Sequence, residues 1–88
     1  MVKTVVLESA KLHQREQAHD YLAQMLALPA YYGRNLDALY DCLTEMGECT
    51  VVLEGREALA MADGYGGKVL AVLWEAALAN PGLHLDIR

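Results

Sequence analysis

The chain has 88 residues, of which 55% are hydrophobic and 22% charged, and its formal net charge is −5 at pH 7. This composition is typical of a globular chain and excludes intrinsic disorder, and the length suits a single domain, residues 1–88, that buries about 60% of its unfolded surface. The acidic balance argues against direct binding to nucleic acid or to an anionic membrane, since both require clusters of Lys and Arg, and favours a basic partner.

The N-terminal residues, the longest apolar run and the two cysteines indicate the compartment in which the protein is expected to act. The first ten residues, MVKTVVLESA, lack the long apolar core of a secretory signal, and the apolar run around residues 69–79 is too short to span a bilayer. Cys42 and Cys49 match no metal or redox spacing. We therefore expect a cytoplasmic protein with reduced thiols, without a metal or another cofactor. These patterns do not determine the oligomeric state.

The N-terminal half is predicted to form a strand, a helix, a loop and a second helix. Residues 2–7 are a β-branched apolar run, typical of a strand covered on at least one face. Apolar residues keep a helical spacing over residues 14–27, and Pro29 ends that helix because the residue before a proline disfavours the α region. Asn35 is a favourable N-cap for the second helix. The expected buried face of that helix consists of Leu36, Leu39, Cys42, Leu43 and Met46.

The C-terminal half continues this alternation. Because helices connect the predicted strands, the strands are expected to pair in parallel. We therefore predict an α/β fold, with a three-stranded parallel β-sheet packed with about four α-helices in one domain. The expected elements are a strand at 50–53, a brief helix at 55–62 with Leu59 and Ala62 inward, a turn at 63–67, a helix at 68–79 and an alternating strand at 83–87.

The second helix carries acidic residues at a spacing that costs stability. Asp37 and Asp41 are four residues apart, so their side chains are neighbours on the exposed arc. Like charges at this spacing destabilise an isolated helix by about 0.2–0.5 kcal/mol. The helix dipole offsets part of this cost for Asp37 and less for Asp41, which lies further from the N-terminus. Since the fold gains nothing from the pair, a functional use is worth seeking.

The acidic cluster formed by Asp37, Asp41, Glu45 and Glu48 has several interpretations. It could be an ordinary solvated helix face. Paired carboxylates for hydrolysis are disfavoured because nothing in the flanking sequence would raise the pKa of one of them, and a metal site lacks a histidine or a glycine-broken oxygen loop. The remaining interpretation is a protein-binding epitope. His13, His19 and His84 match no catalytic or metal pattern and are expected to be structural or on the surface.

Aromatic residues near the cluster favour an epitope. Tyr31, Tyr32 and Tyr40 lie within ten residues of one another. Tyrosine is enriched at interface hot spots, because a rigid apolar ring with a polar tip buries a large area. The alternative is that the tyrosine pair packs its own loop against the core.

The segment from Leu28 to Thr44, LPAYYGRNLDALYDCLT, resembles the signature of the barstar family, the intracellular inhibitors of the bacterial ribonuclease barnase. A looser similarity extends over essentially the whole chain. The resemblance implies a three-stranded parallel α/β fold and an acidic helix that blocks a ribonuclease active site, with carboxylates in place of RNA phosphates. It also implies that the partner-binding residues are Tyr31, Tyr32, Asn35, Leu36, Asp37, Tyr40, Asp41, Thr44 and Glu75.

The chain departs from the family prototype at places that bear on partner choice. Arg34 stands where the prototype carries glutamate, Tyr40 replaces a tryptophan, and the segment 55–67 is shorter. Three hypotheses about the function remain open. The preferred one is inhibition of a small basic extracellular-type ribonuclease, barnase-like, by the acidic helix and the Tyr-Tyr-Gly loop. The alternative is an immunity or binding protein for a different toxin or a non-nuclease partner. The third is a small hydrolase that uses Asp37 and Asp41.

Overall fold

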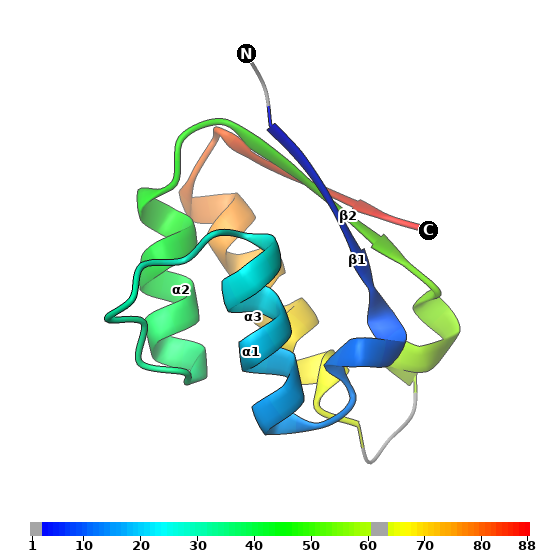
Figure 1. Ribbon diagram of the computed structural model, residues 1–88. Helices are drawn as coiled ribbons and strands as arrows, with labels where there is room; N and C mark the ends of the chain where they lie inside the picture. The colour runs from blue at the N-terminus through cyan, green and yellow to red at the C-terminus, as the bar shows by residue number, and fades with distance from the viewer. Residues whose placement is uncertain (1–2, 61–63) are drawn as a thin grey trace.

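The structure, a computed structural model, describes residues 3–60 and 64–88 and consists of two layers. Strands β1 (Lys3–Glu8), β2 (Cys49–Glu54) and β3 (Leu83–Ile87) form a parallel sheet in the order β1-β2-β3. The helices lie together on one side of this sheet (Figure 1). Each parallel strand must be reached by a crossover, and both crossovers place their helices on the same face. The predicted parallel α/β architecture is confirmed.

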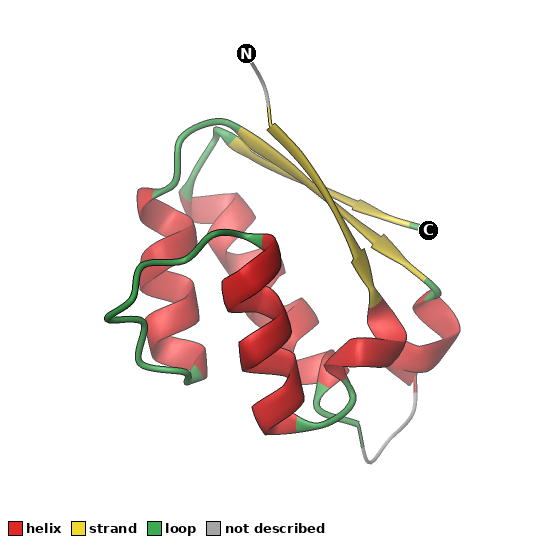
Figure 2. Ribbon diagram, in the orientation of Figure 1, coloured by secondary structure: helices red, strands yellow, loops and turns green. Residues whose placement is uncertain are grey.

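The described residues contain three α-helices, α1 (Arg15–Met25), α2 (Leu36–Glu45) and α3 (Gly66–Ala79), and two 3₁₀ helices, η1 (Ser9–Leu12) and η2 (Arg56–Ala60) (Figure 2). The expectation of about four α-helices is therefore slightly too high. The brief helix predicted after β2 is the 3₁₀ helix η2, in which the Ala58 N–H donates to the Gly55 carbonyl, three residues back, at 3.0 Å. Short segments favour this tighter geometry.

Other predicted boundaries shift by a few residues. Helix α3 begins at Gly66, inside the segment predicted as a turn. Helix α1 ends at Met25, before the Leu28-Pro29 pair, as a proline requires of the residue that precedes it. The side chain of Leu59 and residues Ala62 and Asp63 lie outside the part of the chain that the structure describes.

The hydrophobic core lies between the helices and one face of the sheet. From the sheet it receives Leu7, Val51, Leu53 and Leu83, and from the helices Leu22, Leu39, Leu43, Val69 and Leu73, all of them buried. Along β3, Leu83 is buried, Leu85 and Ile87 are half-buried, and His84 and Asp86 are exposed, which confirms the predicted alternation. On the other face of the sheet the side chain of Val6 is 43% exposed. The core thus supports α2 from behind and leaves its acidic arc in solvent.

Candidate functional site

Side-chain hydrogen bonds hold both ends of helix α2. At the N-terminus, the Asn35 Oδ1 accepts from the Ala38 N–H at 2.7 Å, which confirms the predicted N-cap, and its amide donates to the Gly33 carbonyl at 3.3 Å. At the C-terminus, the Asn80 amide donates to the carbonyls of Leu43 and Met46, each at 3.0 Å. The sequence carries no signal for this second link, because Asn80 lies more than thirty residues further along the chain. The helix is therefore held in position before any partner arrives.

The exposed arc of α2 retains its negative charge. The side chains of Asp37, Asp41 and Glu45 are exposed on α2, and none of them forms a salt bridge with another described residue. Glu48, predicted on the same helical arc, is also exposed and without such a salt bridge, but it lies beyond the end of α2, because the backbone leaves the helical conformation at Met46. Carboxylates that are solvated and unpaired are available to cations of another molecule. The arrangement supports the binding interpretation of the acidic cluster.

The two adjacent tyrosines of the loop between α1 and α2 occupy different environments. Tyr31 is 85% exposed, whereas Tyr32 is only 7% exposed. The Tyr32 Oη lies 2.5 Å from Nδ1 of His19, and Nε2 of His19 lies 2.8 Å from the Oη of Tyr65. Tyr31 is thus free to meet a partner, while Tyr32 attaches the loop to α1 and, through His19, to Tyr65 in the segment before α3.

His19 is a buried structural histidine, 1% exposed. Burial lowers the pKa of His19, with smaller contributions in the same direction from Arg15 and Arg34 that outweigh the opposing one from Asp20. Burial also raises the pKa of Tyr32 to about 12, so both side chains are neutral at pH 7. The sequence contains a signal for this position: His19 precedes Leu22 and Leu26 at helical spacing, on the buried side of α1.

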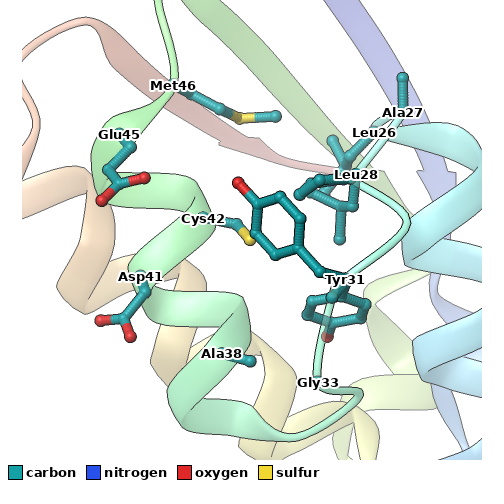
Figure 3. A pocket seen from close by; sticks show the side chains of 12 residues that line it. Leu26, Ala27, Leu28, Tyr31, Gly33, Ala38, Asp41, Cys42, Glu45 and Met46 are labelled. Carbon is teal, nitrogen blue, oxygen red and sulfur yellow. The ribbon is translucent and has the colours of Figure 1, made fainter.

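A groove of about 510 Å³ separates the loop from α2 (Figure 3). Helical spacing predicted Cys42 and Met46 on the buried face of α2, but both are only half-buried and line this groove. Figure 3 shows their side chains directed toward the loop, whereas the carboxylates of Asp41 and Glu45 lie along the outer side of the helix. The lining residues are Leu26, Ala27, Leu28, Pro29, Tyr31, Tyr32, Gly33, Ala38, Asp41, Cys42, Glu45 and Met46.

The remaining predicted binding residues surround the same helix. Asn35, Leu36 and Asp37 line a second hollow at the start of α2, together with Lys68 of α3. Glu75 is exposed and follows Lys68 by seven residues, so it lies on the flank of α3 beside α2. The other two positions, Tyr40 and Thr44, are half-buried, and the Thr44 hydroxyl donates to the Asp41 carbonyl at 3.0 Å.

Arg34 is directed toward α1. Its guanidinium forms a salt bridge with the carboxylate of Asp20, and both side chains are more than half exposed. The backbone of Arg34 has φ 55°, a left-handed conformation that a non-glycine residue seldom adopts. The positive charge that distinguishes this chain is therefore paired within the molecule.

The described part of the chain shows neither a metal-binding cluster nor a membrane-spanning helix. Residues 3–60 and 64–88 contain no group of three or more His, Cys, Asp or Glu side chains that could hold a metal ion. Within the same ranges, no helix combines the length and the apolar character needed to cross a membrane.

A parallel α/β domain that presents an acidic, capped helix beside an exposed tyrosine has the features of a small protein-binding domain. The sequence profile of the family described as Barstar (barnase inhibitor) matches residues 2–86. The chain is also 37% identical over 78 residues to "Putative ribonuclease inhibitor YrdF" of Bacillus subtilis (strain 168), a match that covers 85% of this chain and 86% of that protein. The chain therefore belongs to the barstar family, and the resemblance carried by residues 28–44 is confirmed.

Proposed function

We propose that this protein inhibits a small basic ribonuclease of the barnase type by covering its active site with α2 and the Tyr-Tyr-Gly loop. The family and the relative described as a ribonuclease inhibitor support this role. The observation that carries the proposal is the pair of carboxylates of Asp37 and Asp41, exposed and without a salt bridge to any described residue, on a helix held at both ends. Carboxylates held in this way can replace RNA phosphates against the cations of a nuclease site.

The proposed contact surface has distinct parts. Asp41 at its centre would enter the phosphate site, with Asp37 one turn earlier on the helix. The exposed ring of Tyr31 would cover the nuclease site, while buried Tyr32 would hold the loop in its binding conformation. The remaining residues of the proposed surface are Asn35, Leu36, Tyr40, Thr44 and, on α3, Glu75.

The proposal includes the setting in which the protein acts. We infer that it is an immunity protein that works in the cytoplasm, protects the cell that makes the ribonuclease, and has no catalytic activity of its own. Its net charge of −5 would accelerate encounter with a basic enzyme and would make association slower as salt is added.

A direct test is to titrate the protein into barnase and into a panel of other small basic ribonucleases, and to measure both RNA cleavage and Kd. We expect stoichiometric inhibition of at least one enzyme, relieved by Asp41→Ala and much less by Glu48→Ala. An RNA substrate analogue should compete with the inhibitor. Inhibition that is unchanged in Asp41→Ala, or binding that leaves cleavage intact, would contradict the proposal.

A second candidate function is supported by Arg34. The Arg34–Asp20 salt bridge places a mixed pair of charges beside the acidic face, at a position where the family prototype has a glutamate. Charges at the edge of an interface mainly tune association rate and partner choice. The same surface could therefore serve as an immunity or binding protein for a different toxin. Binding to such a toxin, with no inhibition across the ribonuclease panel, would favour this alternative.

A further inference from the structure

We propose that two copies of this chain form a symmetric dimer through strand β3 and helix α3. In this dimer, β3 pairs antiparallel with β3 of the second copy, so that the two sheets become one continuous sheet. Trp74 and Leu78 of the two α3 helices pack against one another beside the joined strands. The inference goes beyond the proposed function and does not rest on it, because this surface is separate from the acidic arc of α2.

Helix α3 exposes two large apolar side chains. Trp74 is 56% exposed and Leu78 is 77% exposed, and they lie four residues apart, so they are neighbours on one face of the helix. At about 100° per residue, Trp74 lies about 120° around the helix from Lys68, which lines the hollow at the start of α2. The exposed apolar face is thus directed away from α2. An apolar face of this kind normally meets another protein surface.

Strand β3, against which α3 packs, is an edge of the sheet with open backbone groups. The N–H and C=O of alternate residues in a strand point to the same side. The Arg88 N–H donates to the Leu53 carbonyl at 2.7 Å, so the even-numbered residues of this segment face β2. The backbone groups of Leu85 and Ile87 therefore face the free edge. The strand LHLDI contains neither Lys nor Pro, the residues that commonly protect such an edge from pairing.

The two edges of the sheet differ in what the helices leave uncovered. On β1, Val5 and Leu7 are buried, so the apolar face of that strand is already sealed within the molecule. On β3, Leu85 and Ile87 are only half-buried. A strand of a second copy would therefore bury additional apolar surface beside β3 and little beside β1.

A twofold axis through Leu85 makes the β3 edge complementary to itself. Antiparallel pairing about this axis places Leu85 opposite Leu85 of the second copy, and Leu83 opposite Ile87. The Leu85 N–H can then donate to the Leu85 carbonyl of the second copy, and the Ile87 N–H to the Leu83 carbonyl. On the outer face of the sheet, His84 lies opposite Asp86. An axis through Asp86 would instead set two carboxylates opposite each other, which is destabilising.

The groups needed for the pairing of His84 with Asp86 are available. Arg88 binds only one carboxylate oxygen of Asp86, since its Nε and its Nη2 both lie 3.1 Å from Oδ2. Among the described residues, Oδ1 of Asp86 has no hydrogen-bond partner, and His84 is exposed. These two positions form a non-hydrogen-bonded pair of the antiparallel ladder, in which opposite side chains are closest. An imidazole N–H can therefore donate to Oδ1 across the axis, twice by symmetry.

The first experiment measures the mass in solution. Sedimentation velocity over a dilution series from millimolar to micromolar protein should show a concentration-dependent rise from the 9.7 kDa of one chain to twice that mass. Trp74 is the only tryptophan, so its fluorescence should shift to shorter wavelength over the same range. Leu78→Glu should raise the dissociation constant of the dimer by about tenfold or more, because it places a charge in an apolar contact. Ala79→Glu, at an exposed position on the flank of Lys68, adds the same charge and should have little effect.

Exchanged residues test the register. His84→Asp sets two carboxylates opposite each other and should raise the dissociation constant by about tenfold or more. The double variant His84→Asp/Asp86→His restores an acid opposite an imidazole and should recover most of the loss. Both positions are exposed, so the variants should fold, which circular dichroism checks.

Backbone amides provide a measurement without substitution. In hydrogen exchange followed by NMR, the Leu85 and Ile87 amides should become more protected as the protein concentration rises, whereas the His84 and Asp86 amides, which face β2, should not change. A protein that remains monomeric at millimolar concentration would overturn the proposal. A dimer in which the double variant is no tighter than His84→Asp, or in which Leu78→Glu and Ala79→Glu have equal effects, would also contradict it. Each of these outcomes leaves ribonuclease inhibition by α2 untouched.

Discussion

The Nδ1 atom of His19 lies 2.5 Å from the phenolic Oη of Tyr32, and this contact joins α1 to the loop that carries Tyr31. The second ring nitrogen meets the Tyr65 hydroxyl at 2.8 Å, so one imidazole connects three segments. A neutral imidazole has one donor and one acceptor nitrogen, so it donates to one tyrosine and accepts from the other. Protonation would make both nitrogens donors and would place a charge in a buried position beside Arg15 and Arg34.

Stability should therefore depend on pH through His19. Burial lowers the pKa of His19 in the folded protein, so the unfolded chain takes up the proton first. The contribution to stability is fully present above the unfolded pKa, about 6.5, and is lost as the pH falls toward the folded pKa, with a slope of at most about 1.4 kcal/mol per pH unit. Urea unfolding of the wild type should show this decline below pH 6.5. The same decline in His19→Gln would assign the effect to other groups.

Loss of the hydroxyl should destabilise the protein at Tyr32 and have little effect at Tyr31. Tyr32→Phe leaves a buried nitrogen of His19 without its partner, at an expected cost of about 1–3 kcal/mol in the free energy of unfolding. Tyr31→Phe, at an exposed position, should change that free energy by less than about 0.5 kcal/mol. Urea denaturation of the two variants provides the comparison. Equal losses would mean that the His19–Tyr32 contact contributes nothing measurable.

Asp41 should be the strongest determinant of ribonuclease binding. It lies in the middle of α2, between Asp37 and Glu45, where it would be most completely desolvated by a partner. Asp41→Ala should weaken binding by about 2–5 kcal/mol, because it leaves cations of the enzyme unpaired. Asp37→Ala should weaken it less, and Glu45→Ala and Glu48→Ala least. Kd values for the four variants, at low and high salt, test the ranking, and an Asp41→Ala protein that binds like wild type would refute it.

Arg34→Glu should accelerate association with a barnase-like enzyme at low salt. The substitution replaces a cation with an anion and releases the Asp20 carboxylate from its salt bridge, so the surface becomes more acidic. The pair is exposed, so its loss should cost no more than about 1 kcal/mol of stability. Stopped-flow association rates at two salt concentrations measure the effect. Arg34→Gln removes the cation without adding an anion and should give an intermediate rate.

A decrease in association rate for Arg34→Glu would be the contrary result. It would mean that Arg34 itself contacts an acidic group of the partner. That outcome would favour the alternative of a different toxin, and a partner screen with the wild type and Arg34→Glu side by side would then be the next measurement.

The sequence by itself determined the order of the strands and helices, the parallel sheet, the Asn35 cap and the acidic arc of α2. Each depends on residues that are neighbours along the chain, through periodicity, capping or the length of a connection. The segment at 28–44 was sufficient to predict the family. The 3₁₀ geometry of η2 was not predicted, because the composition of a short segment does not distinguish a 3₁₀ helix from an α-helix.

Only the tertiary structure decided which predicted site residues are exposed to a partner and which are buried. Tyr31 and Tyr32 are adjacent and identical in type. They differ because His19, 13 residues before Tyr32 in the chain, forms a hydrogen bond with Tyr32 in the core, and His19 is in turn bonded to Tyr65, 46 residues further along. The Arg34–Asp20 salt bridge, the Asn80 link to α2 and the half-burial of Cys42 and Met46 likewise arise where distant segments pack together. Helical periodicity predicts which side of a helix faces inward, but the neighbouring segment determines whether that side is sealed or borders a groove.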